Sequence, residues 1–360
     1  MATSFTRIPT IDLSLASSPT TLPTLLADLR HALIDIGFLY ISNHGVPSSV
    51  ITDLVTALPD LFNLTPEEKR AVALENSPHF LGYSGVGSES TGGKVDQREQ
   101  YEFATELSAT WHEGLPLAER LRGPNQWPKN DPALRRIIQT YLTSLTHLST
   151  HFLSLVALCL SLPAHTFHHF LSDQHRLKLV HYPIPSHTSS QGVGPHKDSS
   201  GWWTFLLQAS PEAHGLQVLN KSGHWIDVPP VPDTFVVNIG QAFEVVTNGL
   251  CKATTHRVRS GQVERYSVPF FQGVRRDLTR GEASGTLKGF FDGFRSGGEE
   301  GGMEEGRECE EGREIDSPFL MGRYDTWGEA QLRTKVRSHR ENGRRFYAEV
   351  YERFVNDDVM

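Results

Sequence analysis

The chain has 360 residues, of which 38% are hydrophobic and 21% charged, so it holds enough apolar material for a sizeable folded core. Its formal net charge of −8 at pH 7 excludes general nucleic-acid binding, because no basic excess is present to meet phosphate groups. Three widely spaced cysteines, Cys159, Cys251 and Cys309, favour free thiols in a reducing compartment over a disulfide framework.

Residues 1–177 are predicted to form a mostly helical N-terminal part with short strands. After a short strand near Ile11, the spacing of leucines predicts a helix over about 21–36 that ends at Gly37. The β-branched and aromatic residues that follow predict a strand over 38–41.

Three more helices are predicted before residue 163. An amphipathic pattern covers about 48–62, and Thr65 followed by proline and two glutamates is a typical helix start. The Gly/Ser-rich stretch 79–93 is expected to be a long loop, and the longest helical pattern runs over about 132–162.

The sequence changes to short β-rich runs over residues 178–275. The runs are 179–182, 204–207, 216–219, 235–238 and 267–271. Short strands separated by turns favour an antiparallel barrel or jelly roll over βαβ units.

Two further segments follow the β-rich part. Residues 281–316 are Gly/Glu-rich, with an acidic run over 299–314, and they hold too few apolar residues for a core, so we expect a disordered insert. Residues 324–355 return to a helical, mixed-charge pattern that predicts a C-terminal helix. We interpret 1–360 as a single domain.

Two histidines and an aspartate form the most informative pattern in the chain. Residues two apart on a strand project to the same face, so His196 and Asp198 can bind one ion from a single strand. With the later His256 they complete the two-histidine, one-carboxylate set of non-haem Fe(II) oxygenases, which leaves the other metal positions open. The similar His339-Arg340-Glu341 lacks a following histidine and is interpreted as accidental.

A second pair with the same spacing predicts an anion site. Arg265 and Ser267 would point to the same face of a strand, and a guanidinium fork beside a hydroxyl can hold a carboxylate. The turn signal Ser260-Gly261-Gln262 separates them from His256, so the third ligand and the anion site are predicted on adjacent strands of one hairpin.

Other candidate residues carry weaker signals. His147 and His151 are four apart on a helix but lack the glutamate of a metalloprotease helix, so we interpret them as solvated or packed. Four aromatic residues lie near these motifs or the glycine-rich loop and are candidates for a substrate pocket, although buried aromatics are more often plain core. They are Phe103, Trp202, Trp203 and Phe271.

Over nearly its whole length the chain resembles the isopenicillin-N-synthase-like Fe(II)/2-oxoglutarate-dependent dioxygenases. The resemblance is specific in the order and spacing of several segments together. They are Ile8-Pro9-x-Ile11-Asp12, Gly37-Phe38-x-Tyr40-Ile41-x-Asn43-His44-Gly45-Val46, Lys178-Leu179-Val180-His181-Tyr182-Pro183, Gly215-Leu216-Gln217-Val218, Val237-Asn238-x-Gly240 and Thr247-Asn248-Gly249.

The resemblance implies a mainly β fold: a double-stranded β-helix (a jelly roll, cupin-like) with flanking helices and the metal in the barrel mouth. It implies that His196, Asp198 and His256 bind Fe(II), and that O2 and 2-oxoglutarate are co-substrates. Arg265 and Ser267, assisted by the Tyr182 hydroxyl, would then bind the distal carboxylate of 2-oxoglutarate.

Three departures from the family pattern qualify this resemblance. Val180 stands where plant relatives often have asparagine, which puts one co-substrate contact in doubt. The segment 198–204 is one residue longer than usual, which leaves the role of its two tryptophans open. The acidic insert has no typical counterpart.

The expected function is oxidation of a C–H bond in a small organic molecule, by hydroxylation, desaturation or ring closure, in specialised metabolism. Two alternatives remain open: an oxidase of the isopenicillin N synthase type that does not use 2-oxoglutarate, and a non-catalytic small-molecule-binding relative. Residues 1–7 lack an apolar signal core, so we expect a cytoplasmic monomer that binds neither nucleic acid nor membrane.

Overall fold

The computed structural model describes residues 4–129, 131–184, 191–199, 201–295, 317, 319 and 324–356. The strands are β1 (Thr10–Asp12), β2 (Phe38–Ser42), β3 (Gly82–Ser84), β4 (Ser90–Thr91), β5 (Lys94–Val95), β6 (Glu99–Ala104), β7 (Arg176–Tyr182), β8 (Gln191–His196), β9 (Gly201–Gln208), β10 (Leu216–Leu219), β11 (Trp225–Asp227), β12 (Thr234–Ile239), β13 (His256–Arg259) and β14 (Arg265–Gly273). The helices are α1 (Leu22–His31), α2 (Ser48–Phe62), α3 (Pro66–Ala71), α4 (Pro132–Cys159), α5 (Gln241–Val246), α6 (Arg280–Gly285), α7 (Lys288–Arg295), α8 (Trp327–Ser338), α9 (Arg340–Phe346) and α10 (Ala348–Val355).

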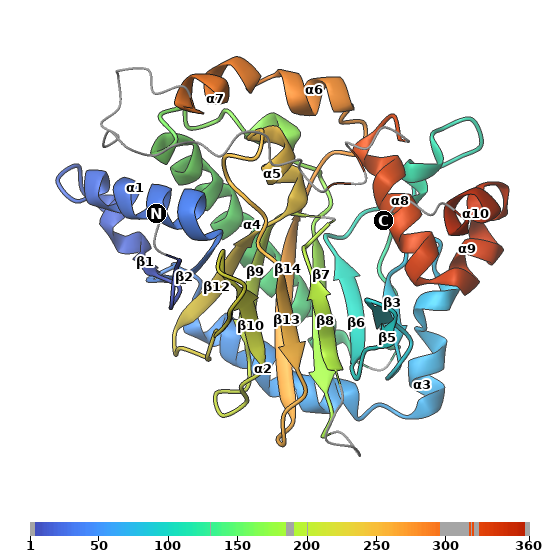
Figure 1. Cartoon of the computed structure of the whole chain (residues 1–360). Coiled ribbons are helices and arrows are strands. Elements are labelled where there is room, and N and C mark those ends of the chain that lie inside the picture. Colours follow the sequence, from blue (N-terminus) through green and yellow to red (C-terminus); the bar gives the residue numbers. More distant parts are fainter. Residues whose placement is uncertain are drawn as a thin grey trace.

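Two sheets form the predicted jelly roll (Figure 1). Among the described residues, the large sheet has the order β1-β2-β12-β9-β14-β7-β6-β3 and the small sheet has the order β11-β10-β13-β8. From β7 to β14 the chain passes repeatedly from one sheet to the other, so most consecutive strands face each other across the core.

Two apolar layers lie on opposite faces of the large sheet. The inner layer joins the two sheets and is rich in valine, namely Val180, Val193, Val218, Val236 and Val258. The outer layer lies between the large sheet and helices α1, α2 and α4 and contains most of the buried residues. The outer layer packs against one face of the large sheet, so the other, inner face is free to line a cavity.

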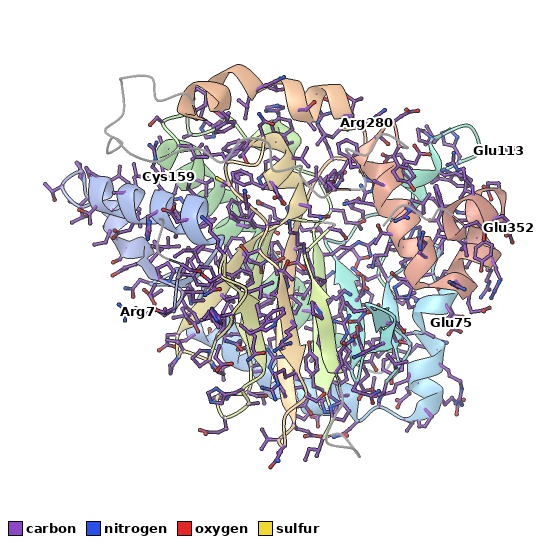
Figure 2. The ribbon with its side chains drawn as sticks, in the orientation of Figure 1. Arg7, Glu75, Glu113, Cys159, Arg280 and Glu352 are labelled. Atoms are coloured by element: carbon purple, nitrogen blue, oxygen red, sulfur yellow. The ribbon has the colours of Figure 1, made fainter. Side chains whose placement is uncertain are left out.

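Helix α4 supplies the centre of the outer layer. By length and composition it could span a membrane, but more than half of its most apolar window is buried inside the protein. Its Phe152 packs edge-on against Trp203 and Phe205 of β9. In this structure α4 is therefore a core helix. Figure 2 shows charged side chains such as Glu75, Glu113 and Glu352 at the outer surface.

The predicted first helix is continuous but changes form near its end. It begins as α1 and closes in a π-helical turn over Ala32–Ile36, and Gly37 then takes a left-handed conformation with φ 76°. A Cβ atom at Gly37 would overlap Thr254 Oγ1 and the Lys252 carbonyl oxygen. Glycine is thus required here both for the backbone angle and for the close approach of the loop before β13.

We expect Gly37→Ala to lower the free energy of unfolding by about 2–4 kcal/mol, since it adds a steric overlap to left-handed strain. Gly45→Ala is the matched control, because Gly45 has φ 77° but a Cβ atom added there would meet no atom within 4 Å. Gly45→Ala should lower the free energy of unfolding by about 1–2 kcal/mol. Urea unfolding measures both, and equal losses would contradict the role assigned to the overlap.

Strand β6 was missed by the sequence prediction. It pairs with β3 and β7 and is buried along its whole length, although its sequence Glu-Gln-Tyr-Glu-Phe-Ala carries three strongly polar residues. The segment 79–93, predicted as one loop, contains β3 and β4. Polar residues hide a strand from pattern analysis when their buried partners come from distant elements.

Part of the predicted disordered insert is helical, which corrects that prediction. Most of residues 281–295 lie in α6 and α7, and Ala283 and Phe291 are fully buried. Two well-placed apolar side chains anchor a segment whose average composition is poor in them. Residues 296–316, with the acidic run 299–314 and Cys309, lie outside the described residues. The predicted C-terminal helix is divided into α8, α9 and α10.

Candidate metal and co-substrate site

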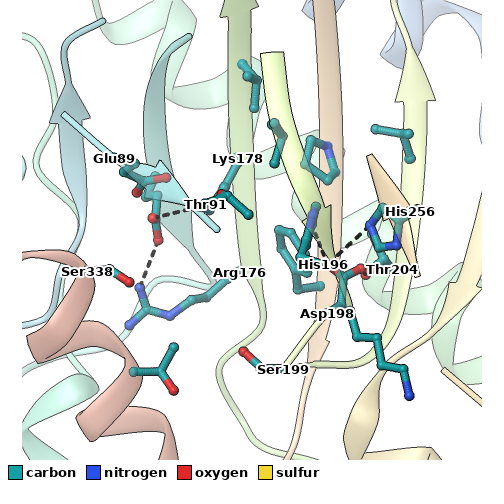
Figure 3. A pocket seen from close by; sticks show the side chains of 18 of the residues that line it. Glu89, Thr91, Arg176, Lys178, His196, Asp198, Ser199, Thr204, His256 and Ser338 are labelled. Carbon is teal, nitrogen blue, oxygen red and sulfur yellow. Dashed lines mark hydrogen bonds and ion pairs between the residues drawn. The ribbon is translucent and has the colours of Figure 1, made fainter. Parts of the chain in front are cut away.

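The three predicted metal ligands converge on one point (Figure 3). His196 ends β8 and His256 begins β13, and the two residues are paired in the small sheet. Oδ1 of Asp198 lies 3.6 Å from Nε2 of His196 and 3.7 Å from Nε2 of His256. Asp198 lies just beyond the end of β8. The prediction that a single strand holds both His196 and Asp198 was therefore wrong.

Hydrogen bonds around the three side chains fix which atoms face inward. Nδ1 of His196 lies 2.8 Å from the Gly194 carbonyl oxygen, and Nδ1 of His256 lies 3.1 Å from that of Thr254. Each Nδ1–H can donate there, which leaves both Nε2 atoms as lone-pair donors for a metal.

The carboxylate is oriented in the same way, by residues to which sequence analysis gave no role. The Thr204 hydroxyl donates to Oδ2 of Asp198 at 2.5 Å, and the Asn238 amide donates to the same oxygen at 2.8 Å. Oδ1 is thereby left to face the imidazoles. Asn238 lies in the family-like segment Val237-Asn238-x-Gly240, which was the available signal.

The electrostatics suit a divalent cation. Burial, with a smaller contribution from His196, lowers the pKa of His256 to about 4, so its imidazole is neutral. Burial would raise the pKa of Asp198, but the two histidines and Asn238 outweigh it and hold that pKa well below its usual range. Neutral imidazoles and an ionised carboxylate are the protonation states that bind metal.

We expect Thr204→Val to weaken iron binding about tenfold, because it removes one hydrogen bond that orients Asp198 without changing the side-chain shape. Thr234→Val, at the partly exposed start of β12, is the matched control and should bind iron normally. Competition with a chelator measures the affinity. An unchanged affinity in Thr204→Val would show that Asn238 alone orients the carboxylate.

The predicted anion site is assembled at the paired ends of β14 and β7, where Arg265 lies opposite Tyr182. Arg265 and Ser267 are 3% and 2% exposed, and the guanidinium carbon is 4.9 Å from the centre of the Tyr182 ring. Burial lowers the pKa of Arg265, but a guanidinium stays protonated. Within the described residues its Nε and Nη1 have no hydrogen-bond partner. A buried cation with unused hydrogen-bond donors is suited to bind a carboxylate.

One cavity of about 450 Å³ joins the two sites. Its lining includes all three metal ligands together with Tyr182, Arg265 and Ser267. The prediction that His256 and Arg265 lie on one hairpin was wrong, because β13 belongs to the small sheet and β14 to the large one. The two groups instead meet across the cavity between the sheets.

The four candidate substrate residues divide between cavity and core. Phe271 lines the cavity. Phe103 is fully buried and stacks on Trp127, and Trp202 and Trp203 are fully buried against Phe243, so these three are core residues and not pocket walls as predicted. Their proximity to the motifs in sequence did not place them in the cavity. Val180 does line it, beside Tyr182.

His339 lies in a charged cluster, but not with Glu341, its partner in the accidental sequence pattern. Glu89, Glu102 and His339 lie within 4.8 Å of one another, whereas Glu341 is not part of this group. Glu102 contacts Lys335 at 2.7 Å and Lys178 at 3.2 Å, so its charge is already balanced by protein cations. This cluster is an ion-pair network and not a second metal centre.

Comparisons with known proteins agree with this geometry. Residues 8–130 match the family described as non-haem dioxygenase in morphine synthesis N-terminal, and residues 174–274 match the 2OG-Fe(II) oxygenase superfamily. The chain is 40% identical over 358 residues to the "2-oxoglutarate-dependent dioxygenase frbJ" of Dothideomycetidae sp., covering 96% of this chain and 94% of that protein. The chain belongs to the 2-oxoglutarate- and Fe(II)-dependent oxygenases.

Other members show how varied the substrates of such oxygenases are. The homoarginine-6-hydroxylase of Glycine max is 31% identical, over 75% of this chain and 86% of that protein. A full-length Neurospora crassa protein, crystallised in complex with alpha-KG and thymine, has a TM-score of 0.65 and 25% identity, covering 75% of this chain and 86% of that one. The jelly-roll fold and the use of Fe(II), 2-oxoglutarate and O2 are therefore established for this oxygenase.

Proposed function

We propose that His196, Asp198 and His256 bind the Fe(II) of this oxygenase, and that Arg265, Ser267 and Tyr182 bind the distal carboxylate of 2-oxoglutarate. The observation that carries the proposal is the convergence of two imidazoles and one carboxylate in the same cavity as a buried arginine with unused donors. These groups match the charges of a ferrous ion and a dianionic 2-oxo acid.

Iron and 2-oxoglutarate, when bound, would supply the oxidising chemistry: O2 would convert the 2-oxo acid to succinate and CO2 and oxidise a substrate C–H bond. The protein residues would orient the metal ligands and the 2-oxo acid, and would shield both from water. Thr204 and Asn238 hold Asp198 in position, and Arg265 fixes the far end of the 2-oxo acid. Val180 and Leu206 give the cavity an apolar lining that excludes water.

We propose that the substrate is a small organic molecule of specialised metabolism and that the outcome is hydroxylation, desaturation or ring closure. The cavity volume of about 450 Å³ supports a small-molecule substrate. The proposal extends to a cytoplasmic monomer that binds neither nucleic acid nor membrane. Free, buried Cys159 and Cys251 support a reducing compartment.

Succinate stoichiometry tests the co-substrate assignment against an oxidase that draws all its electrons from the substrate. We expect one succinate per oxidised product. Product formation without succinate would overturn the 2-oxoglutarate assignment and favour the oxidase. Formation of neither product nor succinate by iron-loaded protein, with a broad metabolite panel, would favour a non-catalytic binding protein.

A further inference from the structure

One strand of the cavity carries positive charge at the end away from Tyr182. Alternate residues of β7 line the cavity in the order Arg176, Lys178, Val180, Tyr182. Tyr182 belongs to the proposed co-substrate end, so the two cations lie at the opposite end of the same face. Lys335 of α8 and Arg98 join them in the cavity lining. We name Arg98, Arg176, Lys178 and Lys335 the cationic wall (Figure 3 shows part of it).

The acids near the cationic wall do not balance its charge. Lys335, Lys178 and Arg176 contact Glu102 at 2.7, 3.2 and 3.3 Å, and Arg98 contacts Glu89 at 2.6 Å and Asp96 at 3.5 Å. Four cations against three carboxylates leave one formal positive charge.

The crowding of positive charge also acts on Lys335. The pKa of Lys335 is lowered to about 8, mainly by burial. Glu102 acts in the opposite direction, and the charges of Arg176 and Lys178 add to the lowering. An anion placed in the cavity would relieve this repulsion.

Glu89 and Glu102 line the cavity together with the four cations, but both acids are held in ion pairs. The Glu102 and Asp96 side chains are 0% exposed, whereas Lys178 is 18% and Lys335 16% exposed. Glu89 keeps 12% exposure but already accepts hydrogen bonds from Arg98 and Gln100. A cationic ligand would therefore meet acids that are already paired, while an anionic ligand could accept hydrogen bonds from the ammonium groups of Lys178 and Lys335, which share the single carboxylate of Glu102.

The strand register gives the distance from the cationic wall to the metal ligands. Thr204, which donates to Asp198, is paired with Phe271, and Phe271 is paired with Arg176. Two strand spacings make about 10 Å. Phe271 lies between the two positions and lines the cavity. A molecule held by an anionic group at the wall would lay its apolar part over Phe271 and present a carbon several bonds away to the metal.

We propose that the substrate of this oxygenase carries a carboxylate, bound by Lys178 and Lys335 at the cationic wall. A singly charged group matches the single excess charge between the four cations and three acids. The inference rests on the proposed function, since it assumes that oxidation takes place at His196, Asp198 and His256. It assigns the two lysines to substrate selection and leaves Arg265 to the co-substrate.

The test uses pairs of small carboxylic acids and their primary amides. Binding is measured without O2, from the change in visible absorption of the complex of protein, Fe(II) and 2-oxoglutarate. We expect at least one acid to bind about tenfold or more tightly than its amide. Lys335→Gln and Lys178→Gln should each remove this preference, and Lys335→Arg should keep it.

Lys69→Gln is the matched control, because Lys69 forms a similarly buried pair with Glu99 at 3.0 Å, has the same 16% exposure, and does not line this cavity. It should keep the preference for acids. Lys178→Gln serves alone if Lys335→Gln does not fold. The inference is overturned if no acid binds more tightly than its amide, or if the folded lysine variants keep the preference. Absence of any absorption from iron and 2-oxoglutarate in the unmodified protein would instead refute the proposed function.

Discussion

His256→Ala should abolish iron binding and lower succinate formation by on the order of 1,000-fold, as expected when a group on which the whole reaction depends is removed. Among the described residues, His196, Asp198 and His256 are the three potential metal ligands that converge at the proposed metal position. The other cluster of such residues, around Glu89, is the ion-pair network described above. Loss of one leaves two ligands, too few to hold the ion firmly or to orient what binds beside it. Iron content and 2-oxoglutarate-dependent succinate release are the two measurements.

His151→Ala is the matched control, because it also removes an imidazole but from the exposed face of α4. Iron content and activity should remain as in the unmodified protein. A His256→Ala protein that keeps full iron and activity would place the metal elsewhere. One that loses iron but keeps its biological effect would revive the non-catalytic alternative.

Arg265→Gln should raise the 2-oxoglutarate concentration needed for half-maximal activity about 100-fold, equivalent to about 2.7 kcal/mol. The guanidinium is buried at 3% exposure, so its charge-assisted hydrogen bonds to a carboxylate meet little competition from water. Glutamine keeps hydrogen-bond donors but loses the positive charge and the paired N–H donors of the planar guanidinium. Iron binding should be unchanged, which separates this variant from His256→Ala.

Arg257→Gln is the control for removal of a nearby arginine. Arg257 lies on β13, stacks on Trp225 at 4.0 Å and donates to Gln217, and it does not line the cavity. It should leave the 2-oxoglutarate dependence unaltered. If Arg265→Gln also leaves that dependence unaltered, Arg265 does not bind the co-substrate, and the oxidase alternative gains support.

Elements specified by local sequence patterns were predicted correctly, whereas an element that depends on distant partners was missed. The helix over 48–62 and the helix start at Thr65 were confirmed, because apolar spacing and capping act within a few residues. Strand β6 was missed, since Glu102 is buried only with the help of lysines from β7 and α8. Both lysines are far from Glu102 in the sequence, so no short stretch of sequence around Glu102 contains them.

The same distinction applies to the site. The residue types and spacing of His196, Asp198 and His256 were enough to name a metal set, because ligand chemistry restricts the choice to few residues. Thr204 and Asn238 were given no role, since many hydroxyl and amide side chains could orient a carboxylate. The aromatic candidates failed for a related reason: whether Trp202 faces the cavity or the core depends on packing against Phe167 and Phe243.

The sequence by itself indicated the chemistry of this oxygenase: its candidate metal ligands, a candidate carboxylate-binding arginine and the series of short strands that predicts a jelly roll. The tertiary structure alone decided which side chains share the cavity. It brought β7, β14 and α8 together around one space and placed Phe271 there and the tryptophans in the core. Metal chemistry depends on residue type and short spacing, whereas a cavity wall is built from strands and helices that meet only when the chain has folded.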